Sequence, residues 1–366
     1  MMGFAGRIVF GIGCAVVLAV VVPHARDGGA ILSAQGDPVA LSDAELRTAA
    51  RPKADDVARE IDQALVSGDT ELATSFIELA HALDIALPDD VTARVDAAVA
   101  DSRTSGHIAR QFASGLVTGE VSDAASLTGT VAGDLFVFGD VRDVVREGKH
   151  LITGEEVDRF VLGLACVGLA VTAGTYASIG LAAPARAGLT LVKDARRAGR
   201  LSAGLGAWAG RSAAALIDKP MLENAVAEAS LTRPSQTVRA IKAAVKLDQA
   251  GEMVSVVKDI GRVGKKAGAR AALDVLKVAE GPEDIARAAR LAAAKGGQTR
   301  AIIKILGRGA LVLASGAFSL ASWVFAAICA LFGFVSSIKS VTERLSLAYF
   351  RHRRRRREHI RALAVA

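Results

Sequence analysis

Three long runs of uncharged residues divide the chain. They are Ile8–Val22 with 15 residues, Phe160–Ala183 with 24 and Ala310–Ile338 with 29. About 20 apolar residues in a helix, each rising about 1.5 Å, cross a hydrocarbon core of about 30 Å. The third run therefore predicts a transmembrane helix, and the first predicts a signal peptide or a signal anchor. The second run is long enough to span, but it also fits a buried helix of a soluble bundle.

Polar stretches between these runs carry apolar residues at helical spacing. Ala54–Val66 has one apolar face, and Asp69 is placed to cap a second helix that continues through Leu83. Ser42-Asp43-Ala44-Glu45 has the spacing of a capping box, which predicts a helix start. These patterns indicate a small bundle of helical hairpins.

The second half of the chain shows the same periodicity. Val254–Ala279 and Asp284–Ala294 are predicted helices, and Pro282 suits the first turn of the latter. The predicted fold class is all-α, a helical integral membrane protein with small helical-hairpin bundles outside the bilayer. Its predicted parts are an N-terminal signal peptide or anchor, an acidic helical bundle, a Gly-rich apolar membrane-associated hairpin, a basic Ala-rich helical region, a transmembrane helix and a polybasic cytoplasmic tail, at 1–26, 27–123, 124–200, 201–309, 310–338 and 339–366.

Composition supports helices and argues against a disulfide or zinc framework. Hydrophobic residues make up 51% of the chain but aromatic residues only 4%, so small apolar residues dominate, which suits close helix packing. Cys14, Cys166 and Cys329 each lie in a separate apolar run, without a second Cys or a His at ligand spacing. The mean hydropathy of +0.35 is high for a soluble protein with 23% charged residues.

The net charge of +7 combines two opposite regions. Asp27–Arg159 has 11 Lys and Arg against 25 Asp and Glu, a net charge of −14, whereas Pro184–Gly309 has 23 against 11, a net charge of +12. Nine cations between Lys339 and Arg361 follow Ala310–Ile338, and five between Arg290 and Arg308 precede it, so the C-terminal tail is predicted to be cytoplasmic. Either an N-terminal signal peptide or an anchor would send the acidic region across a bacterial inner membrane, so that region is predicted to be extracytoplasmic. With a cytoplasmic N-terminus, three simple spans would place that tail outside. The second run is therefore re-entrant, buried, or paired with Ala124–Val141 as a hairpin.

Motifs for common enzyme chemistry are missing from the sequence. Gly261-Arg262-Val263-Gly264-Lys265-Lys266 lacks the first Gly and the final Ser or Thr of a phosphate-binding loop. The six histidines show neither metal-ligand nor catalytic-triad spacing. We expect no catalytic, cofactor-binding or metal-binding residue, and hence a protein that is not an enzyme and has no cofactor.

Two Gly-Asp pairs, Gly133-Asp134 and Gly139-Asp140, frame the apolar stretch Leu135–Phe138. Asp134 and Asp140 are candidates for paired carboxylates at a membrane edge that relay protons or bind ions. The structural alternative is that Asp140 caps a helix Val141–Glu147 and Asp134 faces water, and the readiness with which Asp caps helices favours it.

A short motif follows in Gly148-Lys149-His150-Leu151-Ile152-Thr153-Gly154-Glu155-Glu156. Together with Gly139–Asp143 it resembles the pre-toxin module with a Thr-Gly motif of bacterial polymorphic toxins, over about Gly133–Ala183. The resemblance implies export or membrane engagement and makes Thr153, Gly154 and Glu155 candidate functional residues. The same residues also fit a capping box for the second apolar run.

The tail Arg351-His352-Arg353-Arg354-Arg355-Arg356-Arg357 predicts contact with anionic lipid headgroups. The residues expected to contact lipid are Arg351, Arg353, Arg354, Arg355, Arg356 and Arg357. Nucleic-acid binding is not expected, because no aromatic residues are interleaved with these cations. A protein partner or a second copy is expected to pack on small-residue helix faces such as the one containing Cys166 and Ala170.

Together these features favour a non-enzymatic structural or interaction protein of a bacterial inner membrane. One alternative is a secretion- or toxin-associated membrane-active protein. The other is a small transporter or ion-conducting assembly that depends on Asp134 and Asp140.

Overall fold

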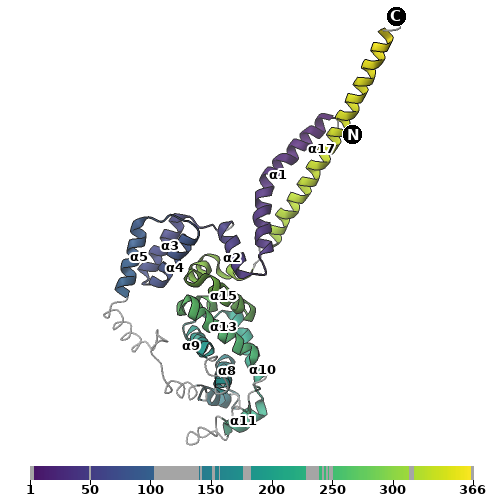
Figure 1. Cartoon of the computed structure of the whole chain (residues 1–366). Helices are drawn as coiled ribbons and strands as arrows, with labels where there is room; N and C mark the ends of the chain where they lie inside the picture. Colours follow the sequence, from purple (N-terminus) through teal and green to yellow (C-terminus); the bar gives the residue numbers. More distant parts are fainter. Residues whose placement is uncertain are drawn as a thin grey trace. The chain divides into compact units, whose positions relative to one another are not determined.

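The chain folds into two helical units, which Figure 1 shows. The computed structural model describes residues 4–48, 51–102, 140, 142–150, 153–155, 157–175, 183–227, 239–240, 243–244, 246, 250–312 and 317–363. Unit 1 comprises Met1–Gly36 and Leu313–Ala366, and unit 2 comprises Asp37–Val312. All regular structure in the described part is helical, which confirms the predicted all-α class.

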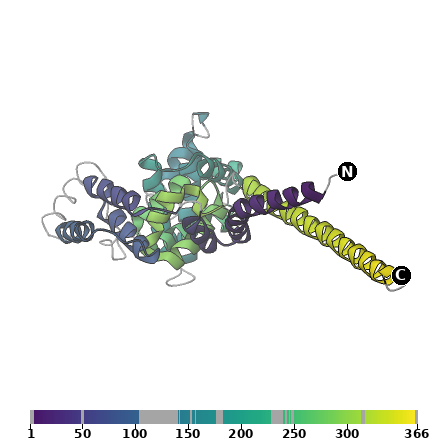
Figure 2. The same cartoon turned by 90° about the horizontal axis from the view of Figure 1, so that it is seen from above.

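Unit 1 is a hairpin of two long helices, α1 (Phe4–Ser33) and α17 (Ala317–Leu363). They run antiparallel along the length of α1, and α17 continues well past the start of α1 (Figures 1 and 2). At about 1.5 Å per residue the 47 residues of α17 reach about 70 Å, more than twice the thickness of a hydrocarbon core.

The third apolar run is divided between the two units. Gly307–Ala310 forms the short helix η3, and Ala310 and Leu311 are fully buried in the core of unit 2. The apolar helix of unit 1 is described from Ala317 onward, seven residues after the start of the run.

Unit 2 contains a helical segment at 142–150 and the remaining helices whose bounds are described. In chain order they are α2 (Pro38–Arg47), α3 (Ala54–Val66), α4 (Thr70–Ala82), α5 (Asp89–Ser102), α8 (Arg159–Thr175), α9 (Ala183–Arg197), α10 (Ala203–Leu216), α11 (Lys219–Ala227), α13 (Gly251–Ala267), α14 (Ala269–Val278), α15 (Pro282–Lys295), η2 (Gly296–Gln298), α16 (Thr299–Leu306) and η3.

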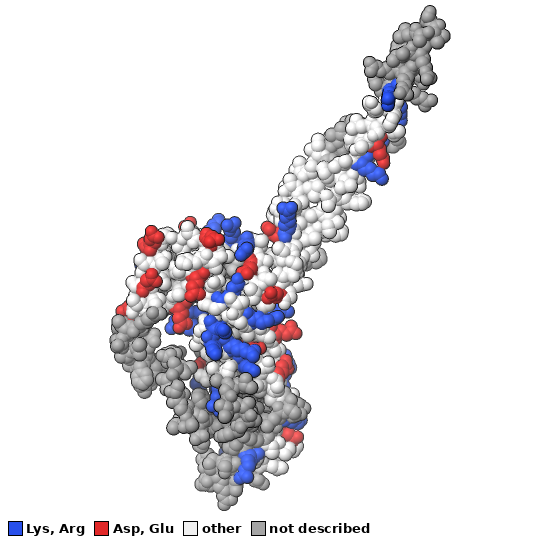
Figure 3. Space-filling model, in the orientation of Figure 1, with Lys and Arg blue, Asp and Glu red and all other residues white. Residues whose placement is uncertain are grey.

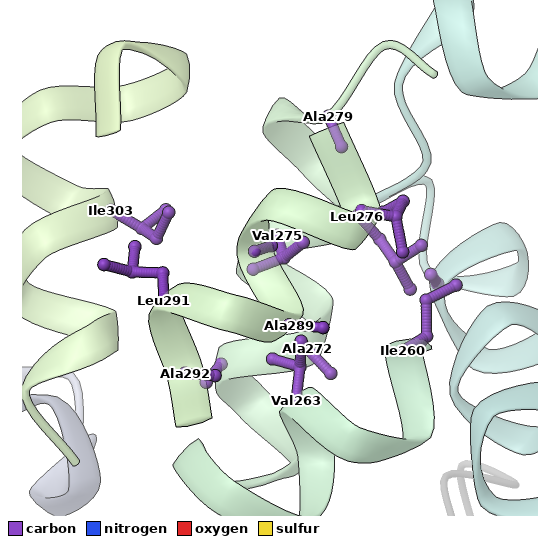
Figure 4. Close-up of a cluster of buried hydrophobic side chains, with 14 of the residues drawn as sticks. Ile260, Val263, Ala272, Val275, Leu276, Ala279, Ala289, Leu291, Ala292 and Ile303 are labelled. Carbon is purple, nitrogen blue, oxygen red and sulfur yellow. The ribbon is translucent and has the colours of Figure 1, made fainter. Parts of the chain in front are cut away.

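Helix α13 lies in the middle of unit 2, against α9, α14 and α15. Its residues Ile260 and Val263 are buried with Val275 and Leu276 of α14 (Figure 4). On the α9 side, a Cβ added to Gly188 would meet the carbonyl oxygen of Val257 at 1.8 Å, so only glycine permits this helix approach. Small residues therefore allow close helix packing within unit 2.

The acidic helices α3, α4 and α5 belong to the same unit as the basic helices. Phe76 of α4 and Ile302 of α16 are both fully buried in one continuous core. Ser75 joins the two regions, because its hydroxyl donates to the carbonyl of Gly297 at 2.6 Å and accepts the N–H of Ala301 at 2.9 Å. The two oppositely charged regions of the sequence therefore fold onto each other.

Helix α8 is a core helix of unit 2 in its described side chains. Leu162, Ala165 and Leu169 are almost completely buried. A Cβ on Gly163 would meet the Cβ of Ala213 of α10 at 2.1 Å, so α10 packs directly on this face. Of the interpretations left open for the second apolar run, burial is the one that these contacts support.

Local expectations are partly confirmed and partly wrong. Asp69 accepts the N–H of Leu72 at 3.1 Å and caps α4, as predicted. The capping box at Ser42 is wrong: α2 already starts at Pro38, Asp37 caps it, and the Ser42 hydroxyl donates to the Val39 carbonyl inside the helix.

The predicted helix Val254–Ala279 is two helices in the structure. Gly268 has φ +96°, which ends α13 and turns the chain into α14. Helix α15 begins at Pro282 and ends at Lys295 with Gly296 as its C-cap, as its start and stop signals predicted.

Candidate functional site

The surface of unit 1 is apolar. Large side chains of both helices are exposed on it, namely Ile12, Val16, Val17 and Val20 of α1 and Phe325, Ile328, Leu331, Phe332, Val335 and Ile338 of α17. Phe332 is 75% exposed. Figure 3 shows these helices as a mostly white surface with few charges. Contiguous apolar surface of this extent marks a site for a membrane or another protein.

Two helices of the described chain, both in unit 1, are long and apolar enough to cross a membrane by length and composition. They are Ile12–Ser33 and Ala321–Arg351. Only 17% and 6% of their most apolar windows are buried. A buried core helix would satisfy the same hydropathy test, but its side chains would be covered by protein.

A ring contact shows the register in which the two helices pack. The rings of His24 and Trp323 stack with their centroids 4.9 Å apart. Both helices rise about 1.5 Å per residue and run in opposite directions. Going back along α1 from His24 to Arg7 therefore covers the same length as going forward along α17 from Trp323 to residue 340. The backbone of Arg7 is thus about level with residue 340, next to Lys339. An apolar band of roughly 25 Å therefore separates the level of Arg7 and Lys339 from that of His24 and Trp323. This thickness is close to that of a hydrocarbon core.

Beyond this band α17 becomes polar. Lys339, Thr342, Glu343, Ser346 and Leu347 line an open groove on it. Further along, the rings of Tyr349 and Phe350 are exposed and meet edge to face at 6.0 Å.

The predicted lipid-contacting arginines all lie on α17. Arg351 and Arg353 are exposed. The backbone of Arg354, Arg355, Arg356 and Arg357 continues the same helix, while their side chains are outside the described part. Contact of these residues with lipid stays a prediction.

Asp140 is a buried carboxylate of unit 2. The Lys193 ammonium of α9 donates to its Oδ1 at 2.6 Å, and the carboxylate lies against Gly168 of α8, where an added Cβ would meet Oδ2 at 1.9 Å. Burial raises the pKa of Asp140, Lys193 opposes this shift, and Asp143 adds to it. Asp134, its predicted partner, lies outside the described residues.

Cys166 lies near this ion pair on α8. Burial, followed by the nearby charge of Asp140, raises the pKa of its thiol to about 12. A thiol with such a pKa remains protonated at neutral pH, so Cys166 acts as an apolar packing residue.

Thr153, Gly154 and Glu155 form the turn before α8. The Thr153 hydroxyl donates back to the Lys149 carbonyl at 3.1 Å, and Gly154 has φ +73°. The N–H of Glu155 donates to the His150 carbonyl at 2.9 Å, and the Glu155 carboxylate is 3.5 Å from the His150 ring. These residues therefore end one helical segment.

The interpretation of Thr153 as a cap of the second apolar helix is wrong. Helix α8 begins only at Arg159, too far along the chain for the Thr153 side chain to reach its free amides. Asp158 caps it instead, accepting the N–H groups of Phe160 at 3.0 Å and Val161 at 3.1 Å.

The sequence reading missed an ion-pair cluster around Arg300, a cation of α16 that is 5% exposed. Its guanidinium donates to both carboxylate oxygens of Asp69, at 2.8 and 2.9 Å, and to Asp274 at 2.9 Å. Arg270 adds a second cation on Asp69 at 2.9 Å. The opposite net charges of the two regions were the only sequence signal for this contact.

The cluster fixes the charge of Asp69. Burial by itself would raise the pKa of this carboxyl, but the hydrogen bonds and charges of Arg300 and Arg270 lower it to about 2. Asp69 thus caps α4 and pairs with α16 through the same carboxylate.

Within the described residues, no group of three or more His, Cys, Asp or Glu side chains is placed to hold a metal ion. Comparison of the chain with protein-family models, with curated proteins and with solved structures gives no match. The resemblance to the pre-toxin module stays a prediction.

Proposed function

We propose that this chain is a membrane-anchored helical protein of a bacterial inner membrane with a structural or interaction role and no enzymatic activity. The observation that carries the proposal is the apolar, exposed surface of α1 and α17. At about 25 cal/mol per Å², such a surface is costly to expose to water and favours transfer into lipid.

The pairing of the two helices supports an anchor over a cleaved signal peptide. A signal peptide would leave the chain, whereas α1 packs against α17 and its His24 stacks on Trp323. His and Trp at one end of the apolar band fit the preference of such rings for the membrane–water interface.

A two-helix anchor also gives a consistent topology. Two spans bring the chain back to the side on which it started, so both ends lie together on the side of the Arg-rich tail, the cytoplasm. Three spans would place the Arg-rich tail outside the cytoplasm, and this conflict arose from counting the second apolar run as a span. With α8 as a core helix of unit 2, that conflict disappears.

Unit 2 then lies wholly outside the cytoplasm. Its basic region does not oppose this, because the positive-inside rule governs short loops and the ends of spans, while long domains are translocated largely regardless of charge. Both the acidic and the basic helices are on the same side, as their ion pairs require.

The ion-conducting alternative draws little support from the position of Asp140. This carboxylate is paired with Lys193 in unit 2 and lies next to the buried helix α8. An intramembrane relay would place it among the helices that face lipid.

Reporter fusions test the topology. We expect fusions after Ala34 and after Ala203 to be active outside the cytoplasm, and a fusion after Ala366 to be active inside it. Extraction of the full chain at alkaline pH should leave it in the membrane fraction. A cytoplasmic reporter at Ala203, or release of the chain by alkali, would overturn the proposal.

A further inference from the structure

The first and last helices of unit 2 contact each other. Helix α2 packs against η3 and against α15. Leu46 of α2 is buried in the same core as Ala310 of η3 and Leu311 directly after it. The Lys295 ammonium of α15 donates to both carboxylate oxygens of Asp43, at 2.6 and 2.9 Å. These contacts hold the two ends of unit 2 at one place.

Both ends of unit 2 continue into the helices of unit 1 after a few residues. Three residues, Ala34–Gly36, lie between α1 and Asp37, the N-cap of α2. Four residues, 313–316, lie between Val312 and the first residue of α17, Ala317. Within unit 1, α1 and α17 pack along each other. The chain thus closes a ring of contacts that contains the hairpin, the two linkers, α2 and η3.

Helix α2 is the weak point of this ring. It has 10 residues, and a helix of this length is marginal in water without packing. Its Glu45 carboxylate lies against η3, 3.2 Å from the place that a Cβ on Gly309 would take. Burial raises the pKa of Glu45, so the ionised carboxylate opposes the docking of α2 at neutral pH. Docking of α2 therefore gains from any further constraint that keeps it beside η3.

The two tethers of α2 supply such a constraint. On one side Ala34–Gly36 join α2 to α1, and on the other side residues 48–53 join it to α3. An undocked α2 has to satisfy both tethers at once, which reduces the number of conformations open to it. Fewer undocked conformations mean a higher effective concentration of α2 at its docking face.

We infer that α2 is a strap across the two ends of unit 2, and that the α1–α17 hairpin keeps this strap docked on η3 and α15. Release of α1 from its place beside α17 removes one tether, so α2 leaves its docked position more often and uncovers Ala310 and Leu311. The inference rests on the proposed membrane anchor and adds a conformational role to it.

The test cuts one tether in the full chain, held in phosphatidylcholine nanodiscs. The recognition sequence of a site-specific protease is inserted between Gln35 and Gly36, which are both exposed. Hydrogen exchange, read by mass spectrometry on peptides that cover Leu41–Leu46, reports how often α2 opens. We expect the cut to speed this exchange by at least about tenfold, because α2 then keeps only its tether to α3.

Two controls separate the tether from the break in the chain. The same recognition sequence between Ala86 and Leu87, in the connection of α4 to α5, leaves the ring of contacts intact when it is cut. That cut should change the exchange of α2 by less than about twofold. An insertion of about 20 Gly and Ser residues between Gln35 and Gly36 lengthens the tether without a new chain end, and should speed the exchange by about fivefold.

The outcomes distinguish this inference from the proposed function. A chain that does not enter nanodiscs would refute the anchor. A chain that enters them but shows the same α2 exchange before and after the Gln35–Gly36 cut would overturn the strap alone. Equal changes after both cuts, or no change with the Gly and Ser insertion, would assign the effect to the broken chain and would also overturn it. Exchange of α13, in the middle of unit 2, should stay slow, and its loss of protection would contradict a role confined to α2.

Discussion

Helices α8 and α17 look alike in the sequence and differ in the structure. Both come from uncharged runs long enough to span a bilayer. The described side chains of α8 are buried by their neighbours, whereas the apolar window of α17 is only 6% buried. Hydropathy measures how strongly a helix avoids water. Whether protein or lipid covers its apolar side chains depends on the helices that pack around it.

Small residues explain much of this difference. Gly163 and Gly168 of α8 let Ala213 and the Asp140 carboxylate approach the helix backbone. Helix α17 instead presents large side chains such as Phe325 and Phe332, which protrude without covering neighbours. The residues around an apolar run thus carry information that its mean hydropathy does not.

The largest expected effect is a charge placed in α8. Leu162→Arg buries a cation in the core around Cys166 and Leu169, and we expect it to cost more than about 4 kcal/mol and to unfold unit 2. Urea unfolding followed by circular dichroism measures the change. Membrane retention should persist, because α1 and α17 are unchanged; loss of retention would mean that α8 is itself part of the anchor.

An arginine in α17 should weaken membrane insertion and leave the stability of unit 2 unchanged. Phe332→Arg is expected to cost about 2.5–3.5 kcal/mol in membrane insertion, the cost of an arginine near the centre of a span. Unit 2 should unfold at the wild-type urea concentration. The readout is the fraction of chain that alkali extracts, and Phe332→Leu serves as the control. Equal extraction of the two variants would show that lipid does not surround this position.

Several helices of unit 2 could be predicted from local sequence patterns, but the contacts between distant helices could not. Periodicity and the Asp69 cap predicted α3 and α4, and the Gly-Pro and Gly-Gly signals predicted α15, because these features depend on neighbouring residues. The pairing of Asp69 with Arg300 joins residues 231 positions apart. No local pattern specifies such a partner, and only the opposite charges of the two regions hinted at it.

The candidate sites also divide into features that a local sequence pattern predicts and features that depend on distant residues. The Arg-rich tail and the apolar helix before it were evident from composition. The burial of Asp140 depends on Lys193 of α9 and Gly168 of α8, which no motif connects. In unit 1 the stacking of His24 on Trp323 likewise joins residues far apart in the sequence.

Acid should weaken unit 2. The folded pKa of Asp69 is about 2, below its value of about 3.9 in an unfolded chain. A carboxylate with a lowered pKa contributes stability above the unfolded value, and that contribution is lost as the pH falls from about 4 to 2. We expect roughly 2 kcal/mol from this group.

Urea midpoints of wild type and Asp69→Asn between pH 7 and pH 2 measure this contribution. Their difference should be largest at neutral pH and shrink below pH 4. A difference that does not change with pH would mean that Asp69 is not charged in the folded protein. Unit 1 does not contain Asp69, so Asp69→Asn should leave the alkali-resistant membrane fraction unchanged. A change in that fraction would contradict the distinction between the two units.

The smallest expected effect tests how α8 begins. Asp158→Ala removes the acceptor of the Phe160 and Val161 amides and should lower the free energy of unfolding by about 1 kcal/mol. The exposed ion pair of Asp158 with Arg196 adds little to this change in the free energy of unfolding. Thr153→Ala, at the position of the sequence-predicted cap, should cost less than about 0.5 kcal/mol, because the Thr153 hydroxyl bonds to carbonyls of the preceding helical segment, at Lys149 and His150. A larger loss for Thr153→Ala than for Asp158→Ala would restore the capping box and move the start of α8 toward the Thr-Gly turn. Since the cap lies at the water-facing end of a buried helix, neither substitution should change the amount of chain that alkali extracts.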